Sequence, residues 1–294
     1  MKLNFLLQLP KLCGVATFCS ILFLSNLAQA SGLMVTPNRV EFSNDAASEE
    51  VKLVNRGNET MTYRVSFQNL RMKQDGTYEE ISAANKGDEK FADNFIKFSP
   101  KRVTLKPGET QVVRLKAKFP AEKGEYRSHL LLSEEVPAEF GNEIEGKKPS
   151  GKNVAVVLKP VFAVSIPVIL RSGDLVSRLS VEKMSVINDK KEKEKKTLLV
   201  HLKREGDASS YGKVVVSLTP KGSSQKQEIA SISNVSVYYP YEGRDLSIPL
   251  DVAKKTRISG ATVDVKFVAA NNTDKDADEN AKEKVLAQKS VVID

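Results

Sequence analysis

The sequence predicts an all-β protein built from two sandwich domains, on three observations. Short segments in which apolar and polar residues alternate follow one another along nearly the whole chain from residue 33 onward. Turn-forming residues such as Asn, Gly, Pro and Asp separate these segments. A long amphipathic helical pattern is missing from the sequence. Together these features are typical of sandwiches, which are assembled from many short strands.

The first 30 residues have the pattern of a secretory signal peptide. Lys2 and Lys11 give a positive start, and an apolar run covers residues 12–24. Ala28-Gln29-Ala30 is a small-x-small cleavage signature. We therefore expect cleavage after Ala30, export, and no membrane insertion of the mature chain. The alternative is an uncleaved N-terminal anchor, although the apolar run falls well short of the roughly 20 residues of a membrane span.

Cysteine and charge exclude several classes of function. Cys13 and Cys19 are the two cysteines of the chain, and both lie in the predicted signal, so the mature protein has no disulfide, thiol nucleophile or thiolate metal site. The formal net charge of +8 becomes +6 when the two signal lysines are removed. Lysines mix with acids along the chain and there is no Trp, so the clustered basic, aromatic surface that binds nucleic acid is not expected.

The first domain is expected over residues 31–172. VKLVNRGNETMTYRVSF reads as a hairpin, with two alternating runs around Asn55-Arg56-Gly57-Asn58. Pro107-Gly108 separates a run with Val103 and Leu105 from a run with Val113 and Leu115. The last segment, NVAVVLKPVFAVSIPVIL, is almost entirely apolar. A strand of this kind is buried on both faces or is available to a partner.

The second domain is expected over residues 173–294, because Arg171-Ser172-Gly173-Asp174 interrupts the strand pattern. Seven strand-like segments follow: LVSRLSVEKMSVI, TLLVHLKR, KVVVSLTP, ISNVSVYYP, DLSIPLD, ATVDVKFVAA and KVLAQKSVVI. Two charged stretches, 189–196 and 271–284, read as solvated loops or, alternatively, as docking tails. A short helix within 277–287 is a further alternative.

The segment GEYRSHLLLSEEVP brings Glu125, Ser128 and His129 close together in sequence, which raises the question of an active site. Neighbouring residues of a strand face opposite sides, so Ser128 and His129 point apart. Glu125 and His129 share a face but lie about 13 Å apart along an extended strand. The other histidine, His201, belongs to the second domain. We therefore expect no catalytic residues, no metal, no cofactor and no enzyme activity, and no phosphate-binding Gly-rich loop occurs.

Tyr126 begins the same strand after a short loop. Immunoglobulin-like sandwiches often place a tyrosine at the start of strand F, with its hydroxyl bonded back to the preceding loop. Tyr126 fits this structural corner by position. The alternative is an ordinary half-buried strand tyrosine.

Five stretches carry a family resemblance: VTPNRVEF, VKLVNRGNETMTYRVSF, FSPKRVTLKPGETQVVRL, GEYRSHLLLSEEVP and the apolar strand ending in AVSIPVILR. In this order they resemble the PapD-like periplasmic chaperones of pilus and fimbria assembly, over residues 33–171. The most specific pattern is SP-x-x-x-x-L-x-PGE-x-Q-x-VRL. The second domain is similar only in size, strand content and place in the chain, as in a divergent member.

The resemblance implies two immunoglobulin-like sandwiches set at an angle, with a cleft between them. It also implies a donor strand, G, at about residues 153–168, which is lent to pilus subunits that lack one strand. Val154, Val156, Leu158 and Phe162 would share one face of it, and the first three are the expected inserted residues. The alternative is that all four pack inside the first domain.

The resemblance further implies that two basic residues bind the carboxylate at the end of the subunit. Arg39 matches the first position, and the fork of its guanidinium suits a carboxylate. The alternative is a solvent-exposed strand arginine. The family's second residue, a lysine, is replaced here by Pro167, which puts a two-point anchor in doubt. Lys159 and Arg171 are nearby substitutes, and the spacing favours neither.

The leading functional hypothesis is therefore a periplasmic chaperone without enzyme activity or cofactor. Its expected partners are pilus or fimbrial subunits and an outer-membrane usher. When the protein is free, a second copy or a loop of its own chain is expected to cover the apolar strand. The main alternative is a two-domain structural or adhesive protein of the cell surface. A third hypothesis, an exported hydrolase, is weakened by the shortage of histidine.

Overall fold

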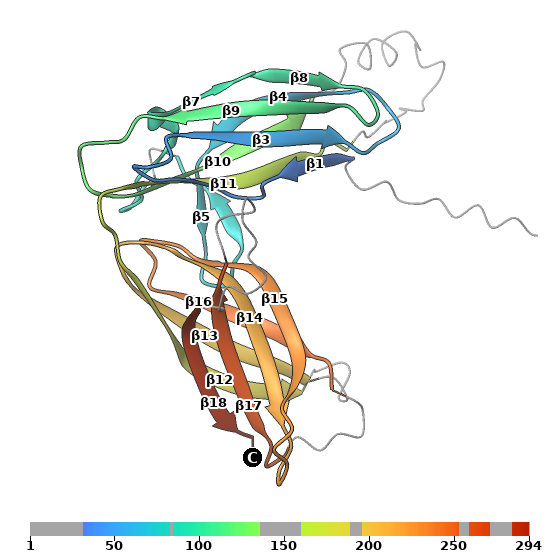
Figure 1. Cartoon of the computed structure of the whole chain (residues 1–294), viewed down its shortest axis with the longest axis vertical. Coiled ribbons are helices and arrows are strands. Elements are labelled where there is room, and N and C mark those ends of the chain that lie inside the picture. The colour runs from blue at the N-terminus through green and yellow to red at the C-terminus, as the bar shows by residue number, and fades with distance from the viewer. Residues whose placement is uncertain are drawn as a thin grey trace, which may run out of the picture. The chain divides into compact units, whose positions relative to one another are not determined.

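The structure is a computed structural model, and it describes residues 32–82, 85–135, 160–188, 196–252, 259–270 and 284–293. Residues 31–294 form one compact unit, separate from residues 1–30. Eighteen strands and one short 3-10 helix, η1 (Asp93–Phe95), make up the regular structure of the described residues (Figure 1). Across these residues we find no helix with the length and apolar character that a membrane span requires.

Nine of the first eleven strands form two sheets that face each other. One sheet has the order β1 (Leu33–Thr36), β3 (Ser48–Asn55), β9 (Thr110–Ala117), β7 (Ile96–Ser99). The other has the order β2 (Val40–Phe42), β11 (Ala163–Ser172), β10 (Gly124–Glu134), β4 (Met61–Gln68), β8 (Arg102–Leu105). Successive strands alternate between the two sheets from β1 to β4 and from β7 to β10, whereas β10 and β11 are neighbours in one sheet. The two strand orders are those of an immunoglobulin-like sandwich. The all-β prediction is confirmed.

The core of this sandwich follows from the period-two pattern of its strands. Val103 and Leu105 of β8 and Val113 and Leu115 of β9 are all at most 5% exposed, as the alternation around Pro107-Gly108 predicts. The residues that alternate with them are polar and exposed: Arg102, Thr104, Arg114 and Lys116. One apolar face per sheet therefore produces a single buried cluster between the two sheets.

The expected hairpin around Asn55 is wrong, because β3 and β4 lie in different sheets. The inward residues of both strands are buried in the same core, Val51 and Leu53 from one side and Tyr63 and Val65 from the other. Two strands can bury opposing faces in this way only when they belong to opposite sheets. The fully buried Asn55 supports the crossing, since its Nδ2 donates to the carbonyl oxygens of Glu59 (2.7 Å) and Leu105 (2.9 Å).

The N-terminal segment LMVTPNRVEF is divided between the two sheets. β1 pairs antiparallel with β3, and β2 pairs parallel with β11. The interruption falls at Pro37, which has no backbone N–H to donate to a ladder. As a result, Arg39 stands directly before β2, the strand that borders β11.

The remaining long strands form two further sheets around a second core. One has the order β12 (Ser177–Asn188), β13 (Lys196–Gly206), β16 (Gly243–Leu250); the other has the order β15 (Gln227–Val237), β14 (Ser210–Thr219), β17 (Thr262–Ala269), β18 (Val285–Val292). All seven strand-like segments of this region are confirmed. No described sheet mixes β1–β11 with β12–β18. Since residues 31–294 form one compact unit, a domain boundary after residue 172 stays a prediction.

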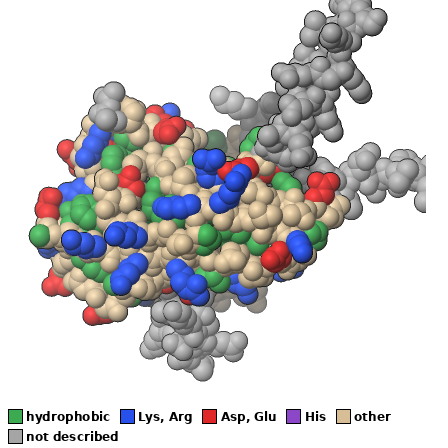
Figure 2. Space-filling model, turned by 90° about the horizontal axis from the view of Figure 1, so that it is seen from above, with side chains coloured by type: hydrophobic (Ala, Val, Ile, Leu, Met, Phe, Trp, Pro, Cys, Tyr) green, Lys and Arg blue, Asp and Glu red, His purple; other side chains and the backbone are tan. Residues whose placement is uncertain are grey.

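The described residues test only part of two further predictions, the helix within 277–287 and the two charged loops. The alternative helix within 277–287 is wrong for its last residues, because β18 begins at Val285, and residues 277–283 lie outside the described part. Most of the two charged stretches also lies outside it. On the face drawn in Figure 2, basic side chains are scattered among acidic and polar ones, as the mixed charge pattern suggests.

Candidate partner-binding site

Strand β10 presents two chemically different faces, as its alternation predicts. Tyr126, Leu130 and Leu132 enter the first core. The Ser128 hydroxyl also points inward, where it accepts the backbone N–H groups of Ala92 and Asp93 at 3.0 and 3.1 Å and donates to Asn69 Oδ1 at 2.6 Å. His129 lies on the other face, against the edge of Tyr78, with ring centroids 5.6 Å apart. Ser128 and His129 therefore make no pair.

Tyr126 makes the bond that a tyrosine corner requires. Its hydroxyl donates to the carbonyl oxygen of Glu122, 3.1 Å away in the loop that leads into β10. Its ring packs edge-on against Phe95, with centroids 5.2 Å apart. These contacts hold the start of β10 in place, and the importance of Tyr126 as a structural corner stays a prediction.

Strand β11 has an edge that is only partly covered. Residues 163–172 pair with β10 along their whole length, whereas β2 covers only Val168–Leu170 on the other side. In the described part of the chain, residues 163–167 thus have a neighbour on one side alone. Pro167 falls in this segment, as expected for a residue that cannot donate to a second ladder. A strand edge of this kind can in general pair with an added strand.

The predicted donor residues border this open edge. Phe162, directly before β11, is 42% exposed, and its carbonyl oxygen accepts the Glu134 N–H at 3.0 Å. Val154, Val156 and Leu158, like Lys159, lie outside the described residues. The predicted strand at 153–168 and the observed β11 overlap at residues 163–168.

Arg39 is buried, with 8% of its surface exposed, so the alternative of a solvent-exposed arginine is wrong. Glu41 Oε1 lies 2.5 Å from both Nε and Nη2, and only the Nε contact has hydrogen-bond geometry. The guanidinium stands over the rings of Tyr211 and Tyr238, at 4.5 and 5.8 Å from their centroids. Burial acts to lower the pKa of Arg39, but Glu41 and Tyr238 outweigh it and the pKa is raised.

Arg171 is committed to partners within the chain. It reaches Glu41 at 3.0 Å, Glu125 at 3.1 Å and the carbonyl oxygen of Ser209 at 3.3 Å. Glu41 therefore bridges Arg39 and Arg171. An arginine held by two carboxylates is a poor replacement for a free lysine, so Arg171 is not favoured as the second basic residue at Pro167.

Arg127 and Tyr238 were not anticipated as site residues. The Arg127 guanidinium lies 4.0 Å from the centroid of the Tyr238 ring, and its terminal nitrogens donate weakly to the carbonyl oxygens of Tyr239 (3.5 Å) and Leu70 (3.4 Å). Burial, followed by the charges of Arg127 and Arg39, lowers the pKa of His129 to about 3. A basic residue inside a strand that is otherwise buried was the available signal for Arg127. The signal for Tyr238 was the aromatic run YYPY.

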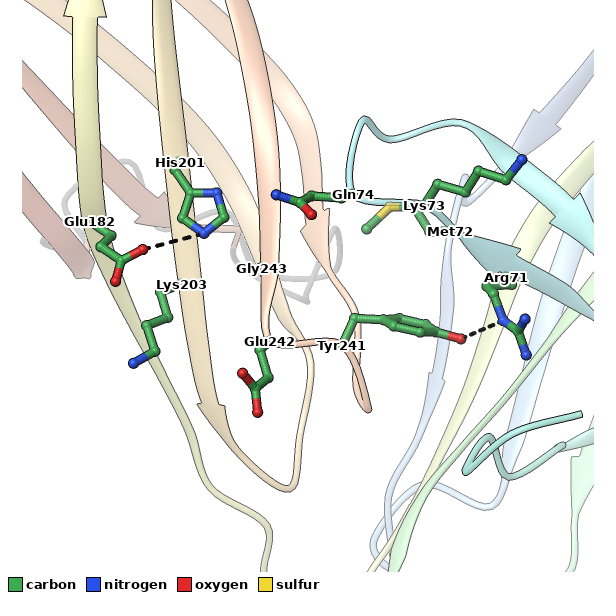
Figure 3. A pocket seen from close by; sticks show the side chains of 10 residues that line it. All are labelled: Arg71, Met72, Lys73, Gln74, Glu182, His201, Lys203, Tyr241, Glu242 and Gly243. Atoms are coloured by element: carbon green, nitrogen blue, oxygen red, sulfur yellow. Dashed lines mark hydrogen bonds and ion pairs between the residues drawn. The ribbon is translucent and has the colours of Figure 1, made fainter.

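A cavity of about 670 Å³ lies beside this cluster (Figure 3). The β5–β6 hairpin (Leu70–Met72 and Tyr78–Glu80) contributes Arg71, Met72, Lys73 and Gln74 to its wall. Strands β12, β13 and β16 and the segment before β16 contribute Glu182, His201, Lys203, Tyr241, Glu242 and Gly243. The Tyr241 hydroxyl donates to Glu89, and Arg71 Nε donates to both, at 2.9 and 2.6 Å. Within the described ranges no group of three His, Cys, Asp or Glu side chains is placed to hold a metal ion.

Comparison with known proteins gives similarity only at the level of structure. No family model matches the sequence, and no curated protein matches it. The YadV chaperone is 12% identical with a TM-score of 0.43, over 88% of this chain and 98% of that one. The CupB2 chaperone of Pseudomonas aeruginosa is 11% identical with a TM-score of 0.43, over 89% of this chain and 100% of that one.

A third similar structure is the CsuC–CsuE chaperone–tip subunit pre-assembly complex of Acinetobacter baumannii. It is 13% identical with a TM-score of 0.40, over 86% of this chain and 96% of that one. Similarities this low do not determine what the present chain binds, so its function has to be argued from its own residues.

Proposed function

We propose that this protein is an exported chaperone of the periplasm, which binds incomplete pilus or fimbrial subunits by lending them a strand. The observation that carries the proposal is the open edge of β11 at residues 163–167, directly after the apolar run that begins at Asn153. An added strand gains affinity from backbone hydrogen bonds and selectivity from alternate side chains. Such binding needs neither a catalytic group nor a cofactor.

In this proposal Val154, Val156 and Leu158 enter the gap in the subunit, and Phe162 marks the end of the lent segment near β11. The signal peptide is removed after Ala30, and an outer-membrane usher receives the complex. When no subunit is bound, a second copy covers the apolar segment, because an exposed apolar strand favours aggregation.

Arg39 would bind the carboxylate at the end of the subunit while it remains paired with Glu41. Glu41 already occupies its Nε edge, while Nη1 has no hydrogen-bond partner. An incoming carboxylate would therefore use Nη1 and share the guanidinium with Glu41. Arg39→Gln should then weaken subunit binding without abolishing it, because the backbone bonds of the added strand remain.

The alternative is a two-domain structural or adhesive protein, which would associate with copies of itself. The same open edge of β11 supports this reading, since pairing of two identical edges also covers it. The two functions differ in the identity of the bound chain, so one isolation experiment separates them.

The test is to isolate the mature protein from its own host under gentle conditions and to identify its companions by mass. The proposal expects a small β-rich exported protein at one-to-one stoichiometry, which is lost on Val156→Asp. Val292→Asp is the matched control, because Val292 is 59% exposed on β18, in another sheet. Recovery of copies of itself alone would reject the chaperone role in favour of the structural one.

A further inference from the structure

Arg127 is a buried arginine that makes no ion pair among the described residues, although the charge of Glu125 acts on it from a distance. Its side chain is 7% exposed, and its Nε has no hydrogen-bond partner. Its other contacts are the Tyr238 ring and two carbonyl oxygens at 3.4–3.5 Å, which is the long limit for a hydrogen bond. A guanidinium stays protonated in proteins, so Arg127 cannot escape the cost of burial by losing its charge.

The surroundings of Arg127 hold more cations than anions. Glu41 and Glu125 make ion pairs with Arg39 and Arg171, and Glu125 also acts electrostatically on Arg127 and Arg204. Five arginines in all lie near Tyr238 or Glu125: Arg39, Arg127, Arg171, Arg204 and Arg244. Arg204 compensates with four backbone carbonyl oxygens. Arg127 and Arg244 make no ion pair within the described residues, and both have an unpartnered buried Nε.

Arg127 and Arg244 share two neighbours, Tyr78 and Tyr238. Both guanidiniums interact electrostatically with the hydroxyl of Tyr78, and both also interact with Tyr238. The β5–β6 hairpin surrounds this region: Leu70 accepts from Arg127, Tyr78 covers His129, and Gly76 packs against the Arg244 side chain. Burial is the main cause of the low pKa of His129, about 3, and the positive charges of Arg127 and Arg39 lower it further.

We propose that Arg127 and Arg244 form a binding site for a carboxylate beneath the β5–β6 hairpin, separate from Arg39. Two unpartnered Nε–H groups, each beside a terminal nitrogen, offer the two-donor edge that a planar carboxylate accepts. A bound anion would supply the charge that the described part of the chain lacks. This site does not depend on the proposed chaperone function.

The cavity beside the hairpin provides the route to this site. Met72 lines the cavity and also packs against Tyr238, whose ring stacks on Arg127. Gly243, also in the cavity wall, directly precedes Arg244. Methionine is flexible and adapts to changes in packing, so a shift of the Met72 side chain would open the path. The cavity wall carries basic side chains, Arg71, Lys73 and Lys203, together with the acids Glu182 and Glu242.

The experiment is a ¹⁵N–¹H NMR titration of the arginine Nε–H groups of the mature protein. The Arg127 signal is assigned by its absence in Arg127→Lys. At constant ionic strength, sodium acetate should shift the Arg127 and Arg244 signals along a saturating curve. The Arg114 signal is the internal control, because Arg114 is 72% exposed and pairs with Glu50 on the surface. Its response should stay small and linear.

A second arm identifies the source of the carboxylate. A short peptide with a free C-terminal carboxylate is compared with the same peptide amidated, and with inorganic phosphate. Saturation by the free-acid peptide but not by the amide indicates a polypeptide terminus, and saturation by acetate and phosphate alike indicates a free oxyanion. Equal shifts with the acid and the amide would overturn the site, as would the lack of a saturating shift with every probe.

A thermal measurement tests the same proposal without an assignment of the arginine NMR signals. Acetate should raise the Tm of the wild type and leave the Tm of Arg127→Gln unchanged, while Arg114→Gln keeps the full shift. An equal rise in all three proteins would show a general salt effect and reject the site. If the site fails while subunit binding survives Arg127→Gln, the proposed chaperone function is unaffected.

Discussion

Glu125 and Ser209, 84 residues apart in the chain, are joined by two hydrogen bonds. The Ser209 amide N–H donates to Glu125 Oε2 at 2.8 Å, and the Ser209 hydroxyl donates to Oε1. The same hydroxyl oxygen accepts the N–H of Tyr239 at 2.9 Å. The carboxylate, which is 1% exposed, also pairs with Arg171. Strand β10 is thereby tied to the segment before β14 through one buried acid.

Glu125→Gln should destabilise the protein by roughly 2–4 kcal/mol, because it leaves Arg171 with one carboxylate instead of two in a mostly buried position. Urea unfolding measures the loss. Glu50→Gln is the control: it removes an exposed pair with Arg114 and should cost at most about 1 kcal/mol. In a double-mutant cycle, Arg171→Met should recover part of the loss. Purely additive losses would contradict a direct Glu125–Arg171 interaction.

His129 should make stability depend on pH between about 3 and 6.5. Its pKa is about 3 in the folded protein against 6.5 for the free side chain. In this window the unfolded chain binds a proton that the folded one does not, so stability falls as pH falls. The stability of His129→Phe relative to wild type should therefore be about 2–3 kcal/mol more favourable at pH 4.5 than at pH 7.5. Denaturant unfolding at several pH values measures this.

The control for His129 is the other histidine, since His201→Gln also leaves the chain with one histidine. His201 is less buried and contacts Asp245 at 2.6 Å. Identical pH slopes of unfolding free energy in wild type and His129→Phe would contradict the assignment.

Glu89 should stabilise the protein over a lower pH range. Burial acts to raise its pKa, but hydrogen bonds from Arg71 and Tyr241 outweigh this and lower the pKa to about 2, from 4.5. Because the folded pKa is depressed, the contribution is fully present above about pH 4.5 and is lost as pH falls toward 2. Glu89→Gln should cost roughly 1–3 kcal/mol at pH 7. The difference from wild type should vanish near pH 2.

The matched control for Glu89 is Glu79→Gln, which removes the more exposed carboxylate from the same Arg71. It should cost less than Glu89→Gln at pH 7. A Glu89→Gln variant whose deficit persists unchanged at pH 2 would show that packing, rather than charge, explains the loss.

Strand positions were predictable here because alternation is local. TLLVHLKR lies within β13, and the inward positions of β8, β9 and β10 are those that the period-two pattern selects. Sheet membership was not predictable in the same way. The turn at Asn55 has the composition of a hairpin, but β3 pairs with β1 and β9, whereas β4 pairs with β10 and β8.

The candidate site shows the same division. Arg39 was selected by its place in PNRVEF, but its burial depends on Tyr211 and Tyr238, which are remote in sequence. The alternation placed Arg127 on the correct face of β10, but it did not predict what Arg127 contacts. The neighbouring hairpin, LRMKQDGTYEE, has a weak strand pattern and was therefore not recognised from the sequence. Convergence of distant side chains is set by packing and cannot be read from spacing.

The division of the N-terminal segment between two sheets has a mechanical consequence. β2 runs parallel to β11, with Val40 opposite Val168 and Phe42 opposite Leu170. A force that pulls the N-terminus away from the chain beyond β11 acts along both strands in opposite directions. The hydrogen bonds between them are then loaded together, in shear, instead of being unzipped one at a time. This short parallel ladder should make the sandwich resist stretching from its N-terminal end.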